Sequence, residues 1–168
     1  MWYVIHVMSG HEEQINKRCR ELMDSDIYEN IFVPKRRTYK RYEGAWHKDE
    51  KVLFPGYLFV VTENINRVYE SLRKIPEYTK VLGTGDDICP VSEEEVSFLA
   101  SVMNEDYVVE ESVGFLIGDE VKIESGPLGG LEGKIQYINR HKREAVIGVD
   151  LFGRVSKMTV ALEVVKRV

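Results

Sequence analysis

The part of the sequence that decides the fold is Val52-Leu53-Phe54-Pro55-Gly56-Tyr57-Leu58-Phe59-Val60-Val61. Its second half is rich in β-branched and aromatic residues, which indicates a strand. The Pro-Gly pair before that half predicts a sharp bend, because proline fixes φ and glycine accepts φ values that other residues avoid. A strand this apolar either lies at the centre of a sheet that is covered on both faces, or offers one face to a partner.

On either side of this stretch the sequence alternates between strands and helices. Residues 2–8 predict a strand, and the S-x-x-E pattern of Ser9 and Glu12 is that of a capping box, so we expect a helix to begin there. Asn64 is expected to cap a second helix, and the S-x-x-E pattern recurs at Ser92 to begin a third. Strands and helices in this order predict an α/β sandwich.

After Gly118 the sequence changes to short apolar runs that are separated by glycine-rich turns. Five strands are expected in this half, at residues 120–124, 133–139, 145–150, 155–160 and 162–165. Five strands in about 50 residues predict a small barrel, because closure removes exposed sheet edges. The predicted domains are an α/β sandwich of residues 1–103, an acidic linker of residues 104–114 and an all-β barrel of residues 115–168.

The formal net charge of −5 is unevenly distributed along the 168 residues. Residues 86–111 hold nine acidic side chains and no lysine or arginine, and we call this segment the acidic strip. Residues 1–85 carry 14 basic and 12 acidic side chains, and residues 112–168 carry nine basic and seven acidic ones. Both flanks are therefore mildly basic, which is compatible with a nucleic-acid partner despite the acidic average.

Residues 31–42 and 45–51 predict a hairpin with its turn at Glu43-Gly44. The first arm contains the stronger of two basic clusters, Lys35, Arg36, Arg37, Lys40 and Arg41. Such an arm is either a solvated strand whose lysines protect a sheet edge, or a surface for phosphates and bases, since Tyr39 is interleaved with the cations. The second cluster, Arg140, Lys142 and Arg143 around His141, by itself favours a polar turn between two strands.

The sequence shows no pattern of catalytic, metal-binding or membrane-spanning residues. The four histidines are scattered, and residues 129–134 lack the first glycine and the hydroxyl of a phosphate loop. Cys19 and Cys89 have neither a CxxC motif nor clustered histidines beside them. No apolar run approaches the roughly 18 residues that span a bilayer. We therefore expect a cytoplasmic, monomeric, non-enzymatic protein with no cofactor and no metal.

Several short motifs follow one another along the chain. In order they are Trp2-Tyr3-Val4, Phe54-Pro55-Gly56-Tyr57, Gly118-Asp119-Glu120-Val121-Lys122-Ile123, Gly126-Pro127-Leu128, Gly133-Lys134-Ile135 and Leu151-Phe152-Gly153-Arg154. Together they resemble the NusG family of transcription elongation factors. The resemblance spans nearly the whole chain. It implies an N-terminal domain of the NusG type, a flexible linker and a C-terminal KOW domain that resembles an SH3 barrel.

The resemblance also implies partners. In the family, the N-terminal domain docks an apolar face on the clamp helices of RNA polymerase, and the positions here that would do so are Phe54, Tyr57, Phe59, Val96 and Leu99. The KOW domain of the family binds other proteins, such as the ribosomal protein NusE or a termination factor, and sometimes RNA. Phe152 and Arg154 lie in the loop that is similar to the one making those contacts.

The two basic clusters make the chain similar to specialised paralogues of the LoaP antiterminator type. Our leading hypothesis is an antitermination factor that docks on RNA polymerase and holds nascent RNA, in particular a leader hairpin, or upstream or non-template DNA. The residues assigned to the nucleic acid are the two clusters, Lys35, Arg36, Arg37, Lys40, Arg41, Arg140, Lys142 and Arg143. Two alternatives stay open: a general NusG factor that recruits NusE or a termination factor, and an RNA-binding barrel with a structural α/β appendage.

Overall fold

The computed structural model describes residues 1–84 and 87–165. Asp86 of the acidic strip and the last three residues of the predicted barrel lie outside this part. Contacts between Cα atoms divide the chain into two compact units, Met1–Pro34 with Phe54–Val96, and Lys35–Leu53 with Ser97–Val168. The predicted hairpin thus belongs to the same unit as the C-terminal half of the chain, although its sequence neighbours on both sides belong to the other unit.

The first unit is built on a four-stranded antiparallel sheet. Its strands, in spatial order, are β2 (Asn30–Phe32), β5 (Tyr57–Val61), β1 (Trp2–Val7) and β6 (Thr79–Val81). The apolar strand β5 therefore lies between two neighbours, and Leu58, Phe59 and Val60 are fully buried. Burial of consecutive residues, whose side chains point to opposite faces, confirms a central strand that is covered on both faces.

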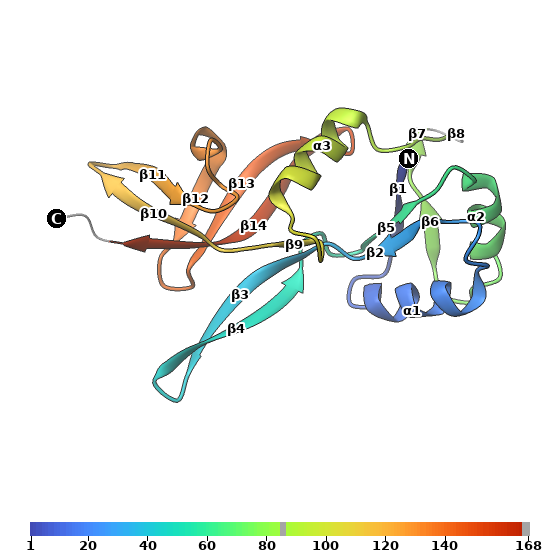
Figure 1. Cartoon of the computed structure of the whole chain (residues 1–168), viewed down its shortest axis with the longest axis horizontal. Helices are drawn as coiled ribbons and strands as arrows, with labels where there is room; N and C mark the ends of the chain where they lie inside the picture. The colour runs from blue at the N-terminus through green and yellow to red at the C-terminus, as the bar shows by residue number, and fades with distance from the viewer. Residues whose placement is uncertain (85–86, 166–168) are drawn as a thin grey trace. The chain divides into compact units, whose positions relative to one another are not determined.

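Helices and two short strands complete this unit. They are α1 (Glu12–Leu22), α2 (Ile65–Leu72), β7 (Gly83–Thr84), β8 (Asp87–Ile88) and the start of α3 (Glu93–Val102). Helix α1 packs against β2 and β5 through Ile15 and Cys19 (Figure 1). Burial, with a smaller effect of Glu77, raises the pKa of the Cys19 thiol to about 12. None of the helices in the described residues has the length and apolar character needed to cross a bilayer.

The capping box predicted at Ser9 is wrong, and the reason lies in the Pro-Gly bend before β5. Helix α1 begins at Glu12 after His11, with no side-chain capping bond. The Glu12 carboxylate is buried and accepts the N–H groups of Gly10, at 3.0 Å, and of Gly56, at 2.8 Å. Gly56 has φ 85° in the turn that Tyr57 N–H closes on the Phe54 carbonyl oxygen. A distant turn thus takes the carboxylate that the capping box would have used.

The other two predicted helix starts are at their expected places. The Ser92 hydroxyl accepts the N–H of Glu95 at 3.2 Å and donates to the Glu95 carboxylate at 2.8 Å, which confirms the capping pattern before α3. Asn64 is the first residue before α2, but its side chain makes no capping hydrogen bond. The helix begins where it was predicted without the predicted contact.

The C-terminal half contains a five-stranded sheet in the second unit. Its strands are β10 (Ser112–Ile117), β11 (Glu120–Ser125), β12 (Ile135–Asn139), β13 (Glu144–Leu151) and β14 (Arg154–Val165), in the order β11-β10-β14-β13-β12, with a 3-10 turn at Glu132–Lys134. The two last predicted strands are one continuous strand, β14. The fifth strand is β10, which begins inside residues 104–114 and pairs in parallel with β14.

The predicted hairpin is present in the second unit. Its arms are β3 (Lys35–Tyr42) and β4 (Ala45–Val52), and the short strand β9 (Val108–Val109) pairs in parallel with the start of β3 (Figure 1). Glu43 and Gly44 have φ of 53° and 75°, as a two-residue hairpin turn requires. The hairpin and its turn are therefore confirmed. Strand β9, like the start of β10, falls within the residues predicted as a linker.

Candidate nucleic-acid interface

The register of the hairpin sorts its side chains onto two faces. Residues directly opposite each other in an antiparallel pair share a face, and Arg41 lies opposite Trp46 whereas Lys40 lies opposite His47. What we call the Trp46 face carries Arg37, Tyr39, Arg41 and Trp46. What we call the Tyr42 face carries Lys40, Tyr42 and His47.

The base of the Trp46 face is neutralised by acidic residues. Arg37 makes a bidentate contact with the Glu110 carboxylate, with Nη2 2.6 Å from Oε1 and Nε 3.1 Å from Oε2. Its Nη1 lies 3.2 Å from the Glu50 carboxylate. The hydrogen bond from Arg37 holds the pKa of Glu110 below its ordinary value. Burial, and a hydrogen bond to Glu111, raise the pKa of Tyr39. The end of the acidic strip thus lies against the basic arm.

The structure brings the two basic clusters together. Arg143, in the turn between β12 and β13, lies over the ring of Trp46, with its guanidinium carbon 4.3 Å from the ring centroid, and 5.8 Å from that of Tyr39. From the hairpin side, Arg36 Nη1 lies 3.2 Å from the carboxylate of Glu144, the residue after Arg143. We call these contacts the hairpin–turn junction. Arg143 also pairs with Glu163 at 3.5 Å, so its charge is already engaged.

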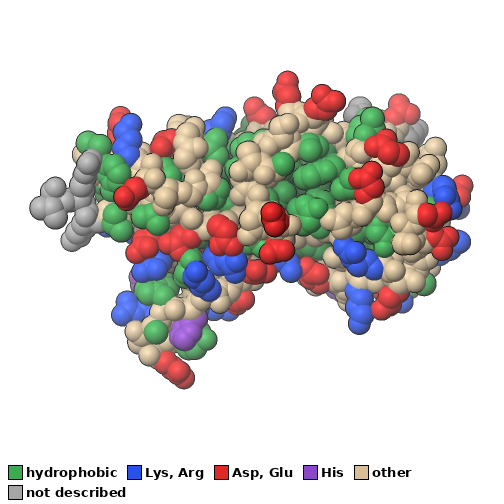
Figure 2. Space-filling view, in the orientation of Figure 1, with side chains coloured by type: hydrophobic (Ala, Val, Ile, Leu, Met, Phe, Trp, Pro, Cys, Tyr) green, Lys and Arg blue, Asp and Glu red, His purple; other side chains and the backbone are tan. Residues whose placement is uncertain are grey.

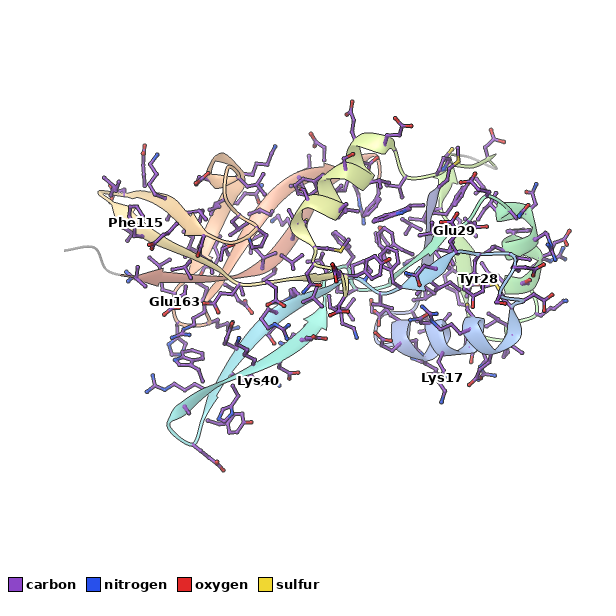
Figure 3. The ribbon with its side chains drawn as sticks, in the orientation of Figure 1. Lys17, Tyr28, Glu29, Lys40, Phe115 and Glu163 are labelled. Atoms are coloured by element: carbon purple, nitrogen blue, oxygen red, sulfur yellow. The ribbon has the colours of Figure 1, made fainter. Side chains whose placement is uncertain are left out.

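Four predicted cations remain available to a ligand. Lys40, Arg41, Arg140 and Lys142 are exposed, and we call them the basic interface. Lys40 has only a 3.8 Å pair with Asp49, and no ion pair among the described residues includes the other three. Lys40 lies on the hairpin in Figure 3, and Figure 2 shows basic and acidic side chains interspersed over this element. Lys35, the remaining residue of the first cluster, is half-buried beside β9.

The residues predicted to dock on polymerase do not form an exposed patch in this structure. Phe54, Phe59 and Leu99 are buried, with 6%, 0% and 0% of their surface exposed, whereas Tyr57 and Val96 are half-buried. Leu99 also belongs to the second unit and the other four to the first. A partner can therefore touch Phe54, Phe59 and Leu99 only after these side chains become exposed.

Within the first unit, the aromatic residues of the sheet cluster on one face. Phe59 stacks on Phe32 with ring centroids 5.4 Å apart, and Trp2 meets Phe32 edge-on at 5.2 Å. Phe54 lies 6.2 Å from Phe59 across the Pro-Gly bend. These rings contribute to the core of the unit, so the stretch that decides the fold also carries the predicted docking residues.

The predicted contact residues of the C-terminal domain lie in the turn between β13 and β14. Phe152 and Gly153 have φ of 58° and 75°, and Leu151 pairs with Arg154 on either side of them. Phe152 is half-buried and Arg154 is exposed. The turn geometry resembles that of the Glu43-Gly44 hairpin.

Sequence reasoning did not assign Trp46, His47, Glu110 or Glu111 to this interface. The turn at Glu43-Gly44 fixes the hairpin register and could have placed Trp46 opposite Arg41 and His47 opposite Lys40. Nothing in the local sequence signals that Glu110 and Glu111 reach the hairpin, because that contact depends on the pairing of β3 with β9.

Exposed cations set among aromatic side chains on a rigid element are typical of proteins that bind nucleic acid. Comparison with known proteins assigns this chain to a family. The family described as "Transcription termination factor nusG" matches residues 1–100. The chain belongs to the NusG family, and it is a NusG-type transcription termination/antitermination factor.

Similar proteins cover almost the full chain. The "Transcription termination/antitermination protein NusG" of Thermus thermophilus is 30% identical over 91% of this chain and 90% of its own length. That of Staphylococcus carnosus is 27% identical over 99% of this chain and 94% of its own. The solved structure "Domain interaction in Thermotoga maritima NusG" has a TM-score of 0.55 and 24% identity, covering 95% of this chain and 92% of that one, which supports the fold.

The Arg37–Glu110 contact predicts an acid-sensitive part of the stability. Because the pKa of Glu110 is lower in the folded protein, its contribution to the free energy of unfolding is present above its ordinary pKa of 4.5, and is lost as pH falls through the lowered value. As the pH falls from above 4.5 to below the lowered pKa, the melting temperature of Glu110→Gln should therefore fall less than that of the native chain. Glu105→Gln, an exposed carboxylate of the same strip, is the control and should melt like the native chain. Equal falls for Glu110→Gln and the native chain would contradict the assignment.

Proposed function

We propose that this chain acts on transcribing RNA polymerase as an antitermination factor, docking through its first unit and binding nucleic acid through its basic interface. The observation that supports this most is the hairpin–turn junction. It holds together two elements that carry exposed cations, the hairpin with Arg41 on the Trp46 face and Lys40 on the Tyr42 face, and the β12–β13 turn with Arg140 and Lys142.

The contrast between the half-buried arginines that carboxylates hold and the exposed cations supports a phosphate-binding role for the basic interface. Arg36, Arg37 and Arg143 are each held by a carboxylate within the second unit. These arginines position the hairpin, whereas the four exposed cations can exchange water and counterions for phosphates. Since a bound phosphate releases counterions, affinity should fall steeply with salt.

We propose RNA as the principal ligand, in particular a hairpin in the nascent leader, with upstream or non-template DNA as the other nucleic acid within reach. Exposed cations on two elements that contact each other can hold a folded RNA by its backbone, because RNA helices are recognised largely by shape and phosphate contacts. A preference for transcripts whose leader forms a hairpin would make the protein a specialised factor of the LoaP type.

We propose that the polymerase clamp helices contact the aromatic face formed by Phe54, Tyr57 and Phe59, together with Val96 and Leu99. The half-buried Tyr57 and Val96 are the accessible members of this set. Because the others are buried, docking requires a conformational change that exposes them, and the free energy of that change reduces the apparent affinity.

The C-terminal sheet is proposed to be a KOW domain with an SH3-like barrel, with residues 104–114 as the connection to it. A second candidate function, recruitment of NusE or a termination factor, is favoured by the tight turn that presents Phe152 and the exposed Arg154 between β13 and β14. Tight binding to NusE without any RNA preference would favour this general function over antitermination.

The first test replaces the basic interface. Lys40→Ala, Arg41→Ala, Arg140→Ala and Lys142→Ala together should weaken binding to an RNA hairpin and reduce the salt slope of log K by up to about 3.6, because each phosphate contact contributes about 0.7 to 0.9. The control removes four exposed cations of the first unit, Lys17, Arg73, Lys74 and Lys80. Affinity is measured by fluorescence anisotropy at several salt concentrations.

The two variants carry the same net charge, so a difference between them reports position and not charge. Similar loss of affinity in both would reject the basic interface as the site. Selectivity for the RNA hairpin is tested separately with a scrambled RNA of the same composition. Equal binding of the two RNAs would reject the RNA hairpin as the preferred ligand.

The second test concerns polymerase. Tyr57→Ala should weaken binding of the chain to purified RNA polymerase, whereas Tyr69→Ala, at an exposed tyrosine of α2, should not. A thermal melt of each variant accompanies the measurement, because truncating an aromatic core side chain can cost about 3 to 5 kcal/mol. Native-like affinity of a folded Tyr57→Ala variant would reject docking through this face.

A further inference from the structure

The end of the hairpin carries a stacked pair of rings that the junction does not use. Tyr42 and His47 lie on the Tyr42 face with ring centroids 3.6 Å apart and an interplanar angle of 10°. The Trp46 face holds the contacts to Arg143, so this pair points to the other side of the hairpin. The hairpin–turn junction is made by other residues, so the stacked pair is left for another role.

The stack is fixed in place and open to solvent. His47 Nε2 lies 3.1 Å from the Tyr42 carbonyl oxygen, which can only accept, so Nε2 carries the proton and the bond holds the imidazole parallel to the phenol. Tyr42 nevertheless exposes 52% of its surface. With one ring face covered by His47, an exposure this large leaves the opposite ring face accessible.

The surroundings of the stack favour a polyanion. Lys40 lies directly opposite His47 on the Tyr42 face, whereas Arg41 and Lys48, next to the pair along the two strands, belong to the Trp46 face. All three cations are exposed, as are two neighbouring acids, Glu43 in the turn and Asp49, which lies on the Tyr42 face and pairs with Lys40 at 3.8 Å. An open aromatic face with Lys40 beside it, and with two more cations on the reverse face of the hairpin, suits a base that stacks while the adjoining phosphates reach the cations.

We propose that Tyr42, backed by His47, is a stacking platform for an unpaired nucleotide base. The platform rests on the proposed nucleic-acid-binding function and names its ligand class more narrowly. A base within a duplex is stacked between its neighbours, so only a base in a single strand, loop or bulge can reach the Tyr42 ring. The platform therefore makes the protein select for unpaired nucleotides, while the basic interface binds the backbone of any nucleic acid.

The test compares an RNA strand with the same strand annealed to its complement, by anisotropy and by the emission of an adenine analogue that stacking quenches. The native chain should bind the single strand more tightly and quench the analogue. Tyr42→Ala should lower single-strand affinity roughly 5- to 150-fold, the range expected for loss of one base stack, and leave duplex affinity unchanged. Tyr42→Phe keeps the ring and should behave like the native chain, as should the control Tyr69→Ala. Repeating both strands as DNA tells whether the platform requires RNA.

The outcomes separate this inference from the function on which it rests. A single-strand preference and quenching that survive Tyr42→Ala overturn the platform, as does an equal loss of single-strand and duplex affinity. Both of these results leave the basic interface standing. Absence of binding to either strand by the native chain overturns the platform and the proposed function together.

Discussion

The contact of Arg143 with Trp46 is the interaction on which the candidate interface depends. It is one of several contacts between the hairpin and the neighbouring sheet, together with the Arg36–Glu144 pair at 3.2 Å. A single exposed ion pair contributes about 0 to 1 kcal/mol, and an exposed cation–π contact about 0.5 to 1 kcal/mol. The side chains here are only 13% to 24% exposed, which places them toward the stronger end. The Arg143–Trp46 contact therefore acts together with the Arg36–Glu144 pair and the pairing of β3 with β9.

This junction divides the basic residues into two groups with different tasks. Arg36, Arg37 and Arg143 hold the hairpin, and their charges are compensated by Glu144, Glu110 and Glu163. The exposed cations are left to meet a ligand from a support that these ion pairs hold in place. Preorganisation of this kind increases affinity because less conformational freedom is lost on binding. In the sequence the acidic strip separates two mildly basic flanks, and in the structure it supplies part of this support through Glu110 and Glu111.

Much of this architecture follows from local sequence signals. The bend at Pro55-Gly56, the central position of β5 and the turn at Glu43-Gly44 are all encoded by residues next to each other in the chain. What could not be predicted depends on contacts between distant residues. Glu12 leaves its capping role because Gly56 offers a buried N–H, and β10 begins within an apparent linker because β14 provides its partner.

The candidate site likewise has features that local sequence predicts and features that depend on distant contacts. Its cations were predicted from the sequence, because charge clusters are visible without a fold. Their separation into engaged and available residues required the register of the hairpin and the position of Glu110. The burial of Phe59 beside Phe32 likewise depends on the pairing of β2 with β5.

The central claim is that the hairpin and the β12–β13 turn form one surface through Arg143 and Trp46. The most direct measurement is the NMR chemical shift of the Arg143 side-chain protons in the full chain. A guanidinium centred 4.3 Å from the Trp46 ring centroid should shift these protons upfield relative to those of Arg140, and Trp46→Leu should abolish the shift. Arg143 protons that resonate like those of Arg140 in the native chain would contradict the account.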